Sequence, residues 1–126
     1  MLELARMMKT RAYAPYSGFA VGAAVRGESG RLYGGCNVEN AAYPQGTCAE
    51  AAAIAALVAG GERRVTEALV LAGGSGLVTP CGGCRQRLRE FADDAAPVHL
   101  CGEGEARTLT LGELLPLSFG PRHLGK

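Results

Sequence analysis

Two short segments of the chain carry the residue types that could act on a small molecule. One is Cys48-Ala49-Glu50 and the other is Pro80-Cys81-Gly82-Gly83-Cys84, and each stands at the start of a run with helical character. Three cysteine thiolates would fill three positions of a tetrahedral zinc ion and leave the fourth open for water, whereas a structural zinc site is usually closed by four protein ligands. Glu50 could then stand beside the metal as a proton carrier without ligating it. The pattern predicts a hydrolytic metal site.

Two less specific interpretations of the cysteines compete with this one. A Cys-x-x-Cys pair can also be a redox dithiol or half of a structural zinc site. The pair does not stand near the start of a βαβ unit with the partners expected of a dithiol. A closed zinc site needs a fourth ligand, and no remaining cysteine or histidine stands at a recognisable ligand spacing: Cys36, His99, Cys101 and His123. Cys36 and Cys101 lie in apolar segments, so we expect them to be buried packing residues.

Glu50 also has an ordinary explanation, because the helix dipole stabilises a carboxylate in the first turn of a helix. The run around it, however, consists mainly of Ala, Ile, Leu and Val. A glutamate on such a helix, next to a candidate metal ligand, is better explained by catalysis than by solvation.

Length, composition and charge narrow the class of protein. The 126 residues are expected to form one domain, residues 1–126, with a single core, and 48% hydrophobic and 20% charged residues are ordinary for a globular protein. A net charge of +1 gives no electrostatic footprint for nucleic acid or an anionic membrane. No apolar run is long enough for a membrane span, and no signal peptide is recognisable. We therefore expect a cytoplasmic protein with a small-molecule substrate.

The elements that must position the site follow from hydrophobic periodicity and from the placement of glycine and proline. The run over residues 47–59 has high helix propensity, Thr47 can cap it, and Gly60-Gly61 ends it. The apolar run over residues 65–72 is typical of a central strand covered on both faces. The other expected elements are a helix over 2–13, hairpin strands over 19–26 and 31–38, a loop over 39–46, a link over 73–79, a helix over 81–91, strands over 97–101 and 107–111, and a short helix over 112–115. This order predicts an α/β sandwich with a sheet of about five strands, where the starts of the two cysteine-bearing helices can meet at one edge.

The chain resembles the small zinc-dependent cytidine deaminases, which act on free nucleosides as homotetramers. A Cys followed by x-Glu and then by Pro-Cys-x-x-Cys is the signature of the zinc deaminases. Further motifs typical of this family follow in the same order along nearly the whole length. The matching segments are residues 14–24, residues 35–41, Tyr43-Pro44, Cys48-Ala49-Glu50, residues 80–86, residues 113–116 and Ser118-Phe119-Gly120-Pro121. The resemblance implies a three-layer α/β/α sandwich with a mixed sheet.

The resemblance also implies roles for individual residues. One Zn²⁺ per chain would be held by Cys48, Cys81 and Cys84, with Glu50 as the proton shuttle. The substrate would be bound by Phe19 against the pyrimidine, Asn37 and Glu39 at the sugar 3′-hydroxyl, the Ala49 N–H at the base O2, the Thr79 carbonyl at the exocyclic amine, and Tyr43 and Phe119 from neighbouring subunits. The implied reaction is the hydrolytic deamination of cytidine and 2′-deoxycytidine to the uridine nucleosides, with release of ammonia, in pyrimidine salvage.

Two alternatives to this function stay open at the level of sequence. A related small zinc deaminase could act on another cytosine-containing compound such as blasticidin S, although Ser118-Phe119-Gly120-Pro121 looks more like the nucleoside enzymes. From a different class, a non-catalytic module could use the thiolates for a structural zinc ion. That module would have a fourth protein ligand and would tolerate Glu50→Gln.

One position departs from the family pattern. Relatives often carry an arginine directly after the catalytic glutamate, where it offsets the thiolate charge, but this chain has Ala51. We expect the two helix N-termini, together with Gln86 or a nearby arginine, to compensate. The three arginines of the second helix fall on more than one face, so we expect them to be mainly solvated or interface charges: Arg85, Arg87 and Arg89.

Overall fold

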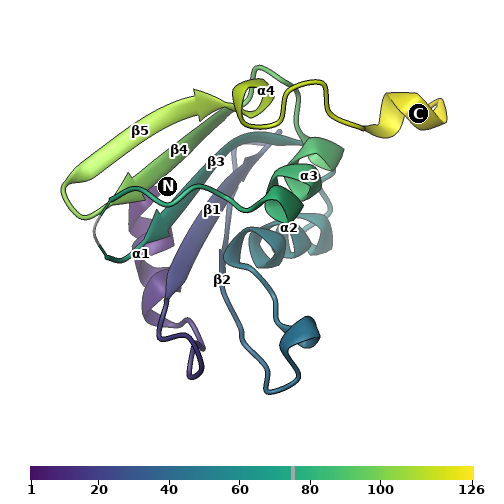
Figure 1. Cartoon of the computed structure of the whole chain (residues 1–126). Coiled ribbons are helices and arrows are strands. Elements are labelled where there is room, and N and C mark those ends of the chain that lie inside the picture. The colour runs from purple at the N-terminus through teal and green to yellow at the C-terminus, as the bar shows by residue number, and fades with distance from the viewer. Residues whose placement is uncertain (75) are drawn as a thin grey trace.

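The computed structural model describes residues 1–74 and 76–126 and consists of a mixed five-stranded sheet with helices on both faces (Figure 1). The strands are β1 (Val21–Gly27), β2 (Leu32–Cys36), β3 (Val65–Ala72), β4 (Pro97–Gly102) and β5 (Glu105–Thr110). The helices are α1 (Leu2–Thr10), α2 (Ala49–Ala59), α3 (Gly82–Phe91) and α4 (Leu111–Leu114), and two short 3-10 turns, η1 and η2, span Tyr43–Gln45 and Pro121–Leu124. No helix in the described ranges is long and apolar enough to cross a membrane.

The strand order is β2-β1-β3-β4-β5, with β3 in the middle as predicted. The strands pair antiparallel except for β3 and β4, which are parallel and are connected through α3. Parallel neighbours need such a crossover, and a helix usually supplies it. The predicted link over residues 73–79 also lies in this connection, and residue 75 of it is outside the described residues.

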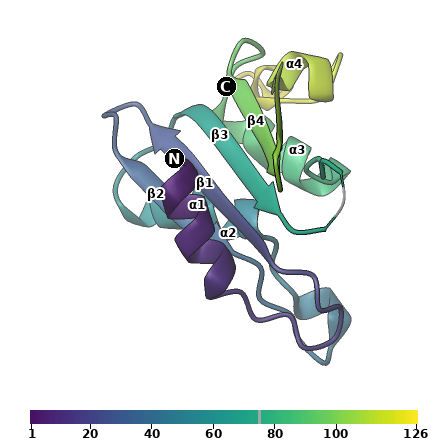
Figure 2. The same cartoon turned by 90° about the vertical axis from the view of Figure 1, so that its left-hand side faces the viewer.

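Helices cover the sheet on both sides, which confirms the predicted three-layer α/β/α sandwich. Figure 2 shows α1 in front of the sheet, with α2 and α3 behind it. Glycines permit these close approaches: a Cβ atom on Gly22 would collide with the backbone of Ala5 in α1, and one on Gly35 would collide with the backbone of Ala49 in α2. The alanine-rich face of α2 therefore lies directly on β2.

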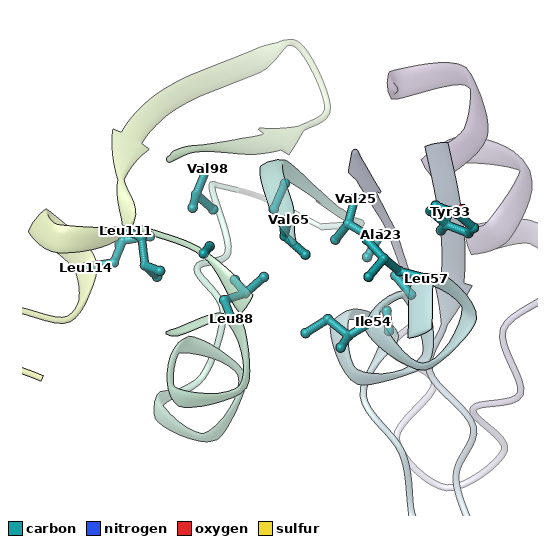
Figure 3. Close-up of a cluster of buried hydrophobic side chains, with 14 of the residues drawn as sticks. Ala23, Val25, Tyr33, Ile54, Leu57, Val65, Leu88, Val98, Leu111 and Leu114 are labelled. Carbon is teal, nitrogen blue, oxygen red and sulfur yellow. The ribbon is translucent and has the colours of Figure 1, made fainter. Parts of the chain in front are cut away.

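The larger hydrophobic core fills the space between the sheet and the layer of α2, α3 and α4 (Figure 3). Leu57 of α2 and Leu88 of α3 are almost completely buried in it. A smaller cluster on the opposite face includes Ala5 of α1 and Cys101 of β4. The larger core fixes α2 and α3 on the same face of the sheet, which determines where their first turns lie.

Several predicted boundaries are wrong by a few residues, and tertiary contacts explain the differences. The first helix ends at Thr10 rather than at residue 13, because Tyr13 forms a bridge with Val38. Thr47 does not cap α2, because it pairs with Val38 through two backbone hydrogen bonds of 2.8 and 2.9 Å. The N-cap of α2 is Cys48 instead. At the other end of the chain, the short helix begins at Leu111, one residue earlier than expected.

The end of α2 is tied to the β1–β2 hairpin through Glu62. Its carboxylate accepts hydrogen bonds from the Ser29 backbone N–H (3.0 Å), the Ser29 hydroxyl (2.7 Å) and the Tyr33 hydroxyl (2.6 Å). These bonds, that of the Ser29 backbone first, lower the pKa of Glu62 from 4.5 to about 2. Because the folded-state pKa is depressed, the carboxylate stabilises the fold above about pH 4.5, and this contribution is lost as the pH falls towards 2.

Glu62→Gln is therefore expected to lower the melting temperature at pH 7, and the difference from the unchanged protein should shrink as the pH is lowered. Thermal unfolding followed by circular dichroism between pH 7 and pH 3 would measure this. Glu28→Gln, in the exposed part of the same turn, is the matched control and should have little effect. A loss of stability that does not change with pH would contradict the role of the ionised carboxylate.

Candidate active site

The three cysteines of the two sequence motifs converge at the starts of α2 and α3. Cys48 is the N-cap of α2, Cys81 is the N-cap of α3, and Cys84 lies in the first turn of α3. Their sulfur atoms all lie within 4.8 Å of one another, and all three are free thiols. Cys84 is fully buried and Cys81 is exposed, so the cluster reaches from the core to the surface.

The topology of the sheet explains this convergence. Both β2 and β3 run antiparallel to β1, so the two strands point in the same direction and their carboxyl ends share one edge of the sheet. The chain leaves β2 towards α2 and leaves β3 towards α3. Both helices then pack on the same face of the sheet (Figure 1). Their first turns, which carry the cysteines, are thereby brought together.

The cluster has the donor set that zinc prefers, since thiolate sulfur is a common ligand of this ion. No fourth histidine, cysteine or carboxylate atom joins it in the part of the chain that the structure describes. A closed structural site therefore lacks its fourth ligand among these residues. Three sulfur ligands leave a coordination position for water.

Burial and helix N-termini act differently on the three thiols. Burial is the main cause that raises the pKa of Cys48 and of Cys84 above the ordinary value. Hydrogen bonding from the backbone N–H of Cys84, with a smaller contribution from Gly83, lowers the pKa of Cys81. Free N–H groups at a helix start stabilise negative charge in this way. Burial thus favours the neutral thiol at Cys48 and Cys84, and a cation bound beside them would favour their thiolates.

Glu50 lies in the first turn of α2 with only 6% of its surface exposed. It is the one buried charged residue in the described part of the chain. Burial raises the pKa of the Glu50 carboxyl, and smaller opposing effects come from hydrogen bonding with Cys84 and from the charge of Arg87. A carboxyl that is buried beside a metal cluster is suited to accept and return protons.

Two of the three arginines of α3 have structural roles within the chain. Arg85 donates to the carbonyl oxygens of Pro80 (2.8 Å) and Leu114 (2.7 Å), which ties the start of α3 to α4. Arg89 pairs with Asp94 in the following loop. The expectation that the arginines of this helix are mainly solvated or interface charges is therefore wrong for Arg85 and Arg89.

The third arginine of this helix lies at the metal cluster. The guanidinium Nη1 of Arg87 lies 3.7 Å from the sulfur of Cys84, to which it donates a hydrogen bond. Gln86, the other expected donor, instead gives its hydrogen bond to the backbone oxygen of Phe119 (2.9 Å). In this chain, which has Ala51 after the glutamate, the side-chain cation at the sulfur comes from α3.

Asn37 and Glu39 follow β2 and flank Val38, which ties this segment to the residue before Cys48. Val38 pairs with Tyr13 on one side and with Thr47, the neighbour of Cys48, on the other. The side-chain amide of Asn37 donates to the Phe19 carbonyl and accepts from the Val21 N–H, both at 2.8 Å. Asn37 thus fixes the backbone of the segment that leads into β1.

Glu39 anchors the loop before Phe19 in a similar way. Its carboxylate accepts the backbone N–H groups of Tyr16 (3.0 Å) and Ser17 (3.1 Å) and the Ser17 hydroxyl. The hydroxyl bond is the largest of the causes that lower the pKa of Glu39. The carboxylate also lines a hollow of about 380 Å³, together with Tyr16, Ser17, Asn40, Tyr43 and Gly46.

The other predicted substrate residues differ in how deeply they are buried. Ala49 is buried directly between Cys48 and Glu50, whereas Thr79 is exposed two residues before Cys81. Phe19 is 41% exposed and Tyr43 is 76% exposed, with the Tyr43 ring edge-on to Tyr16. Phe119 lies on the C-terminal tail, which extends away from the sheet (Figure 1), and stacks on His123 with the ring centres 5.2 Å apart.

Comparison with known proteins identifies the family. A family model, the cytidine and deoxycytidylate deaminase zinc-binding region, matches residues 1–100 of the chain. The chain belongs to this deaminase family. A cytidine deaminase from Sporosarcina psychrophila is 40% identical over 125 residues, which cover 98% of this chain and 92% of the relative.

Solved structures of zinc deaminases have the same fold. The crystal structure of cytidine deaminase from Burkholderia pseudomallei gives a TM-score of 0.88 at 39% identity and covers 93% of this chain and 94% of its own. The crystal structure of cytidine deaminase from Mycobacterium tuberculosis gives a TM-score of 0.81 at 39% identity and covers 94% of this chain and 93% of its own. The predicted family, fold class and zinc cofactor are therefore confirmed, and in this deaminase Cys48, Cys81 and Cys84 form the cluster that can hold the ion.

The sequence did not single out Tyr16 and Ser17, which hold the carboxylate of Glu39, although they stand in a recognised motif. It predicts Gln86 or a nearby arginine as the donor to a sulfur atom, and the structure shows that Arg87 donates to Cys84. Its position three residues after Cys84 places both side chains on one helix face, and this spacing is a signal that could have revealed it.

Proposed function

We propose that this deaminase hydrolyses cytidine and 2′-deoxycytidine to uridine and 2′-deoxyuridine with release of ammonia. The observation that carries the proposal is the buried carboxyl of Glu50 in the first turn of α2, whose N-cap Cys48 forms a cluster of three thiols with Cys81 and Cys84 of α3. Close relatives along the whole chain are named cytidine deaminases, which supports the choice of substrate.

The proposed chemistry is a substitution at C4 of the cytosine ring. A zinc ion held by Cys48, Cys81 and Cys84 supplies Lewis-acid activation of water. The carboxylate of Glu50 takes a proton from the attacking water and passes it to N3 of the ring. Glu50 then carries the second proton to the exocyclic nitrogen, the C4–N bond breaks, and ammonia leaves with the oxygen of water retained on C4.

The start of α2 is also suited to orienting the base. The N–H of Ala49 lies in the first turn, where backbone donors have no partner within the helix. We assign it to the base O2, which would hold C4 towards Glu50. Phe19 would cover the ring face, and the carbonyl of Thr79 would accept a hydrogen bond from the exocyclic amine.

On the sugar side, we assign Asn37 and Glu39 to the 3′-hydroxyl. Glu39 lines the hollow described above, and its lowered pKa keeps it anionic at neutral pH. An anion at this place repels a phosphate, so the site should prefer a nucleoside to a nucleotide.

We further propose a homotetramer in which Tyr43 and Phe119 complete the sites of neighbouring subunits. Both rings are largely exposed, and Phe119 is carried on a tail that extends from the body of the chain. Light scattering of the active enzyme would measure its mass, and a monomer with full activity would contradict this assembly.

The free thiols of the site also favour a reducing compartment, so we place this activity, and its role in pyrimidine salvage, in the cytoplasm. Fractionation of the producing cells would test this placement, because enzyme found outside the cytoplasm would contradict it.

The absorbance change on mixing the zinc-loaded protein with nucleosides tests the function. Cytidine and 2′-deoxycytidine should be converted, while cytidine 5′-monophosphate should react far more slowly because of Glu39. Conversion of blasticidin S but not of cytidine would transfer the assignment to the related deaminases. No reaction with any of them, with one zinc per chain, would overturn the proposal.

A further inference from the structure

We propose that Arg87 is a positioning residue of the metal site, which holds the Cys84 thiolate and offsets the negative charge of the three sulfur ligands. The proposal concerns the zinc site itself and rests on the proposed function only in taking zinc as its metal. It adds a side-chain cation of α3 to the partial positive charge of the two helix N-termini.

The first support is the contact between the two side chains. Arg87 stands three residues after Cys84, and its Nη1 lies 3.7 Å from the Cys84 sulfur. This distance is within hydrogen-bond range for sulfur, whose acceptor radius is larger than that of oxygen. Cys84 itself is fully buried, so the guanidinium reaches the inner sulfur of the cluster from the outer side of α3.

The space around the guanidinium gives a second, independent support. A Cβ atom on Gly83 would lie 3.2 Å from Nη1 of Arg87 and 3.8 Å from the sulfur of Cys81. The missing side chain at this position leaves the guanidinium room over the first turn of α3, next to the Cys84 sulfur. Across the groove between α2 and α3, the small side chain of Ala51 lines the same hollow as Arg87.

The charge balance of the site favours such a cation. Three thiolates on a divalent zinc ion leave one net negative charge, and an ionised Glu50 adds a second. Arg85 is bound to backbone carbonyls and Arg89 is paired with Asp94, so neither is directed at the sulfur atoms. The carboxylate that could compete for Arg87 is Glu90, which lines the same groove.

Removal of the charge by Arg87→Gln is expected to weaken zinc binding. Partners of metal ligands typically contribute 10- to 100-fold to metal affinity, and because Arg87 is otherwise exposed we expect about 10-fold. Competition with a chromophoric chelator would measure the zinc dissociation constant without any nucleoside. In the cobalt-substituted protein, the sulfur-to-cobalt absorption bands should shift, because the electron density on the Cys84 sulfur changes.

Matched variants separate this role from a general effect of charge or folding. Arg107→Gln removes the same charge from an exposed position of β5 and should leave the zinc dissociation constant unchanged. Arg87→Lys should retain part of the affinity. Ala51→Arg in the Arg87→Gln background should restore it, because position 51 faces the same groove. Circular dichroism of the metal-free proteins would check the fold.

Zinc affinity and cobalt absorption test the role of Arg87 independently of the substrate. A zinc affinity of Arg87→Gln within about twofold of the unchanged protein, with unshifted cobalt bands, would overturn the proposal. If Arg87→Gln does not fold, Arg87→Met decides instead, because it also removes the charge and keeps an unbranched side chain; zinc affinity within about twofold of the unchanged protein would again overturn the proposal. Failure to deaminate cytidine with normal zinc binding would affect the proposed function and not this inference.

Discussion

Replacement of Glu50 by glutamine is expected to abolish deamination while the protein keeps its fold and its zinc. The amide has nearly the same shape as the carboxyl but cannot carry protons between water, N3 and the leaving amine. General acid–base catalysis typically contributes 10²- to 10⁴-fold, and one group here serves several transfers, so we expect a loss of at least about 10³-fold. The absorbance assay with cytidine, together with zinc analysis, measures both quantities.

In the same variant, the stability of the fold is not expected to fall with the activity. Burial disfavours the charged form of Glu50, so a neutral amide should leave the melting temperature unchanged or raise it. Glu3→Gln is a matched control, because Glu3 also lies in the first turn of a helix but is exposed. It should retain full activity. Substantial activity in Glu50→Gln would show that this glutamate is only a helix-dipole residue.

The second large effect is expected for Cys84→Ala. Removal of one of the three ligands leaves two sulfur atoms, and two protein ligands are too few to bind zinc more strongly than water does. We expect less than stoichiometric zinc and activity below detection even with added zinc. Zinc content by atomic absorption and turnover of cytidine would be measured side by side, before and after treatment of the unchanged protein with a chelator.

Cys101→Ala is the control for the loss of a buried thiol. Cys101 is also buried, but it packs against α1 on the opposite face of the sheet, away from the metal cluster. It should lose some stability and keep its zinc and activity. Full zinc occupancy in Cys84→Ala would remove Cys84 from the ligand set and reopen the structural interpretation of the cysteines.

The parts of the site that sequence predicts well are those that depend on local spacing. Cys48 and Glu50 are two residues apart, and Cys81 and Cys84 are three apart, so each pair is placed by one helical start. The long, continuous hydrophobic run of β3 also predicts its central place in the sheet. The sequence predicts that the two helix starts meet at one edge, but the full strand order and the pairing of β1 with β3 depend on contacts between distant segments.

Contacts between distant segments explain the remaining differences. Thr47 has the chemistry of a helix cap, but its pairing with Val38 competes and prevails. Asn37 bonds to residues 16 to 18 positions earlier in the chain, and no local pattern specifies that choice. Arg87 has the right spacing from Cys84, but the open space that it occupies is bordered by Gly83 and by the groove that it shares with Ala51 of the other helix.

The meeting of Cys48 with Cys81 and Cys84 has a consequence for the unfolded chain. A metal bound by all three cysteines would close a loop that contains the whole of α2 and β3, including the central strand of the sheet. Such a cross-link reduces the number of conformations open to the denatured chain, much as a disulfide does. The ion would then raise the free energy of unfolding as well as supply chemistry. In a cell short of zinc, the same protein would be both inactive and less stable.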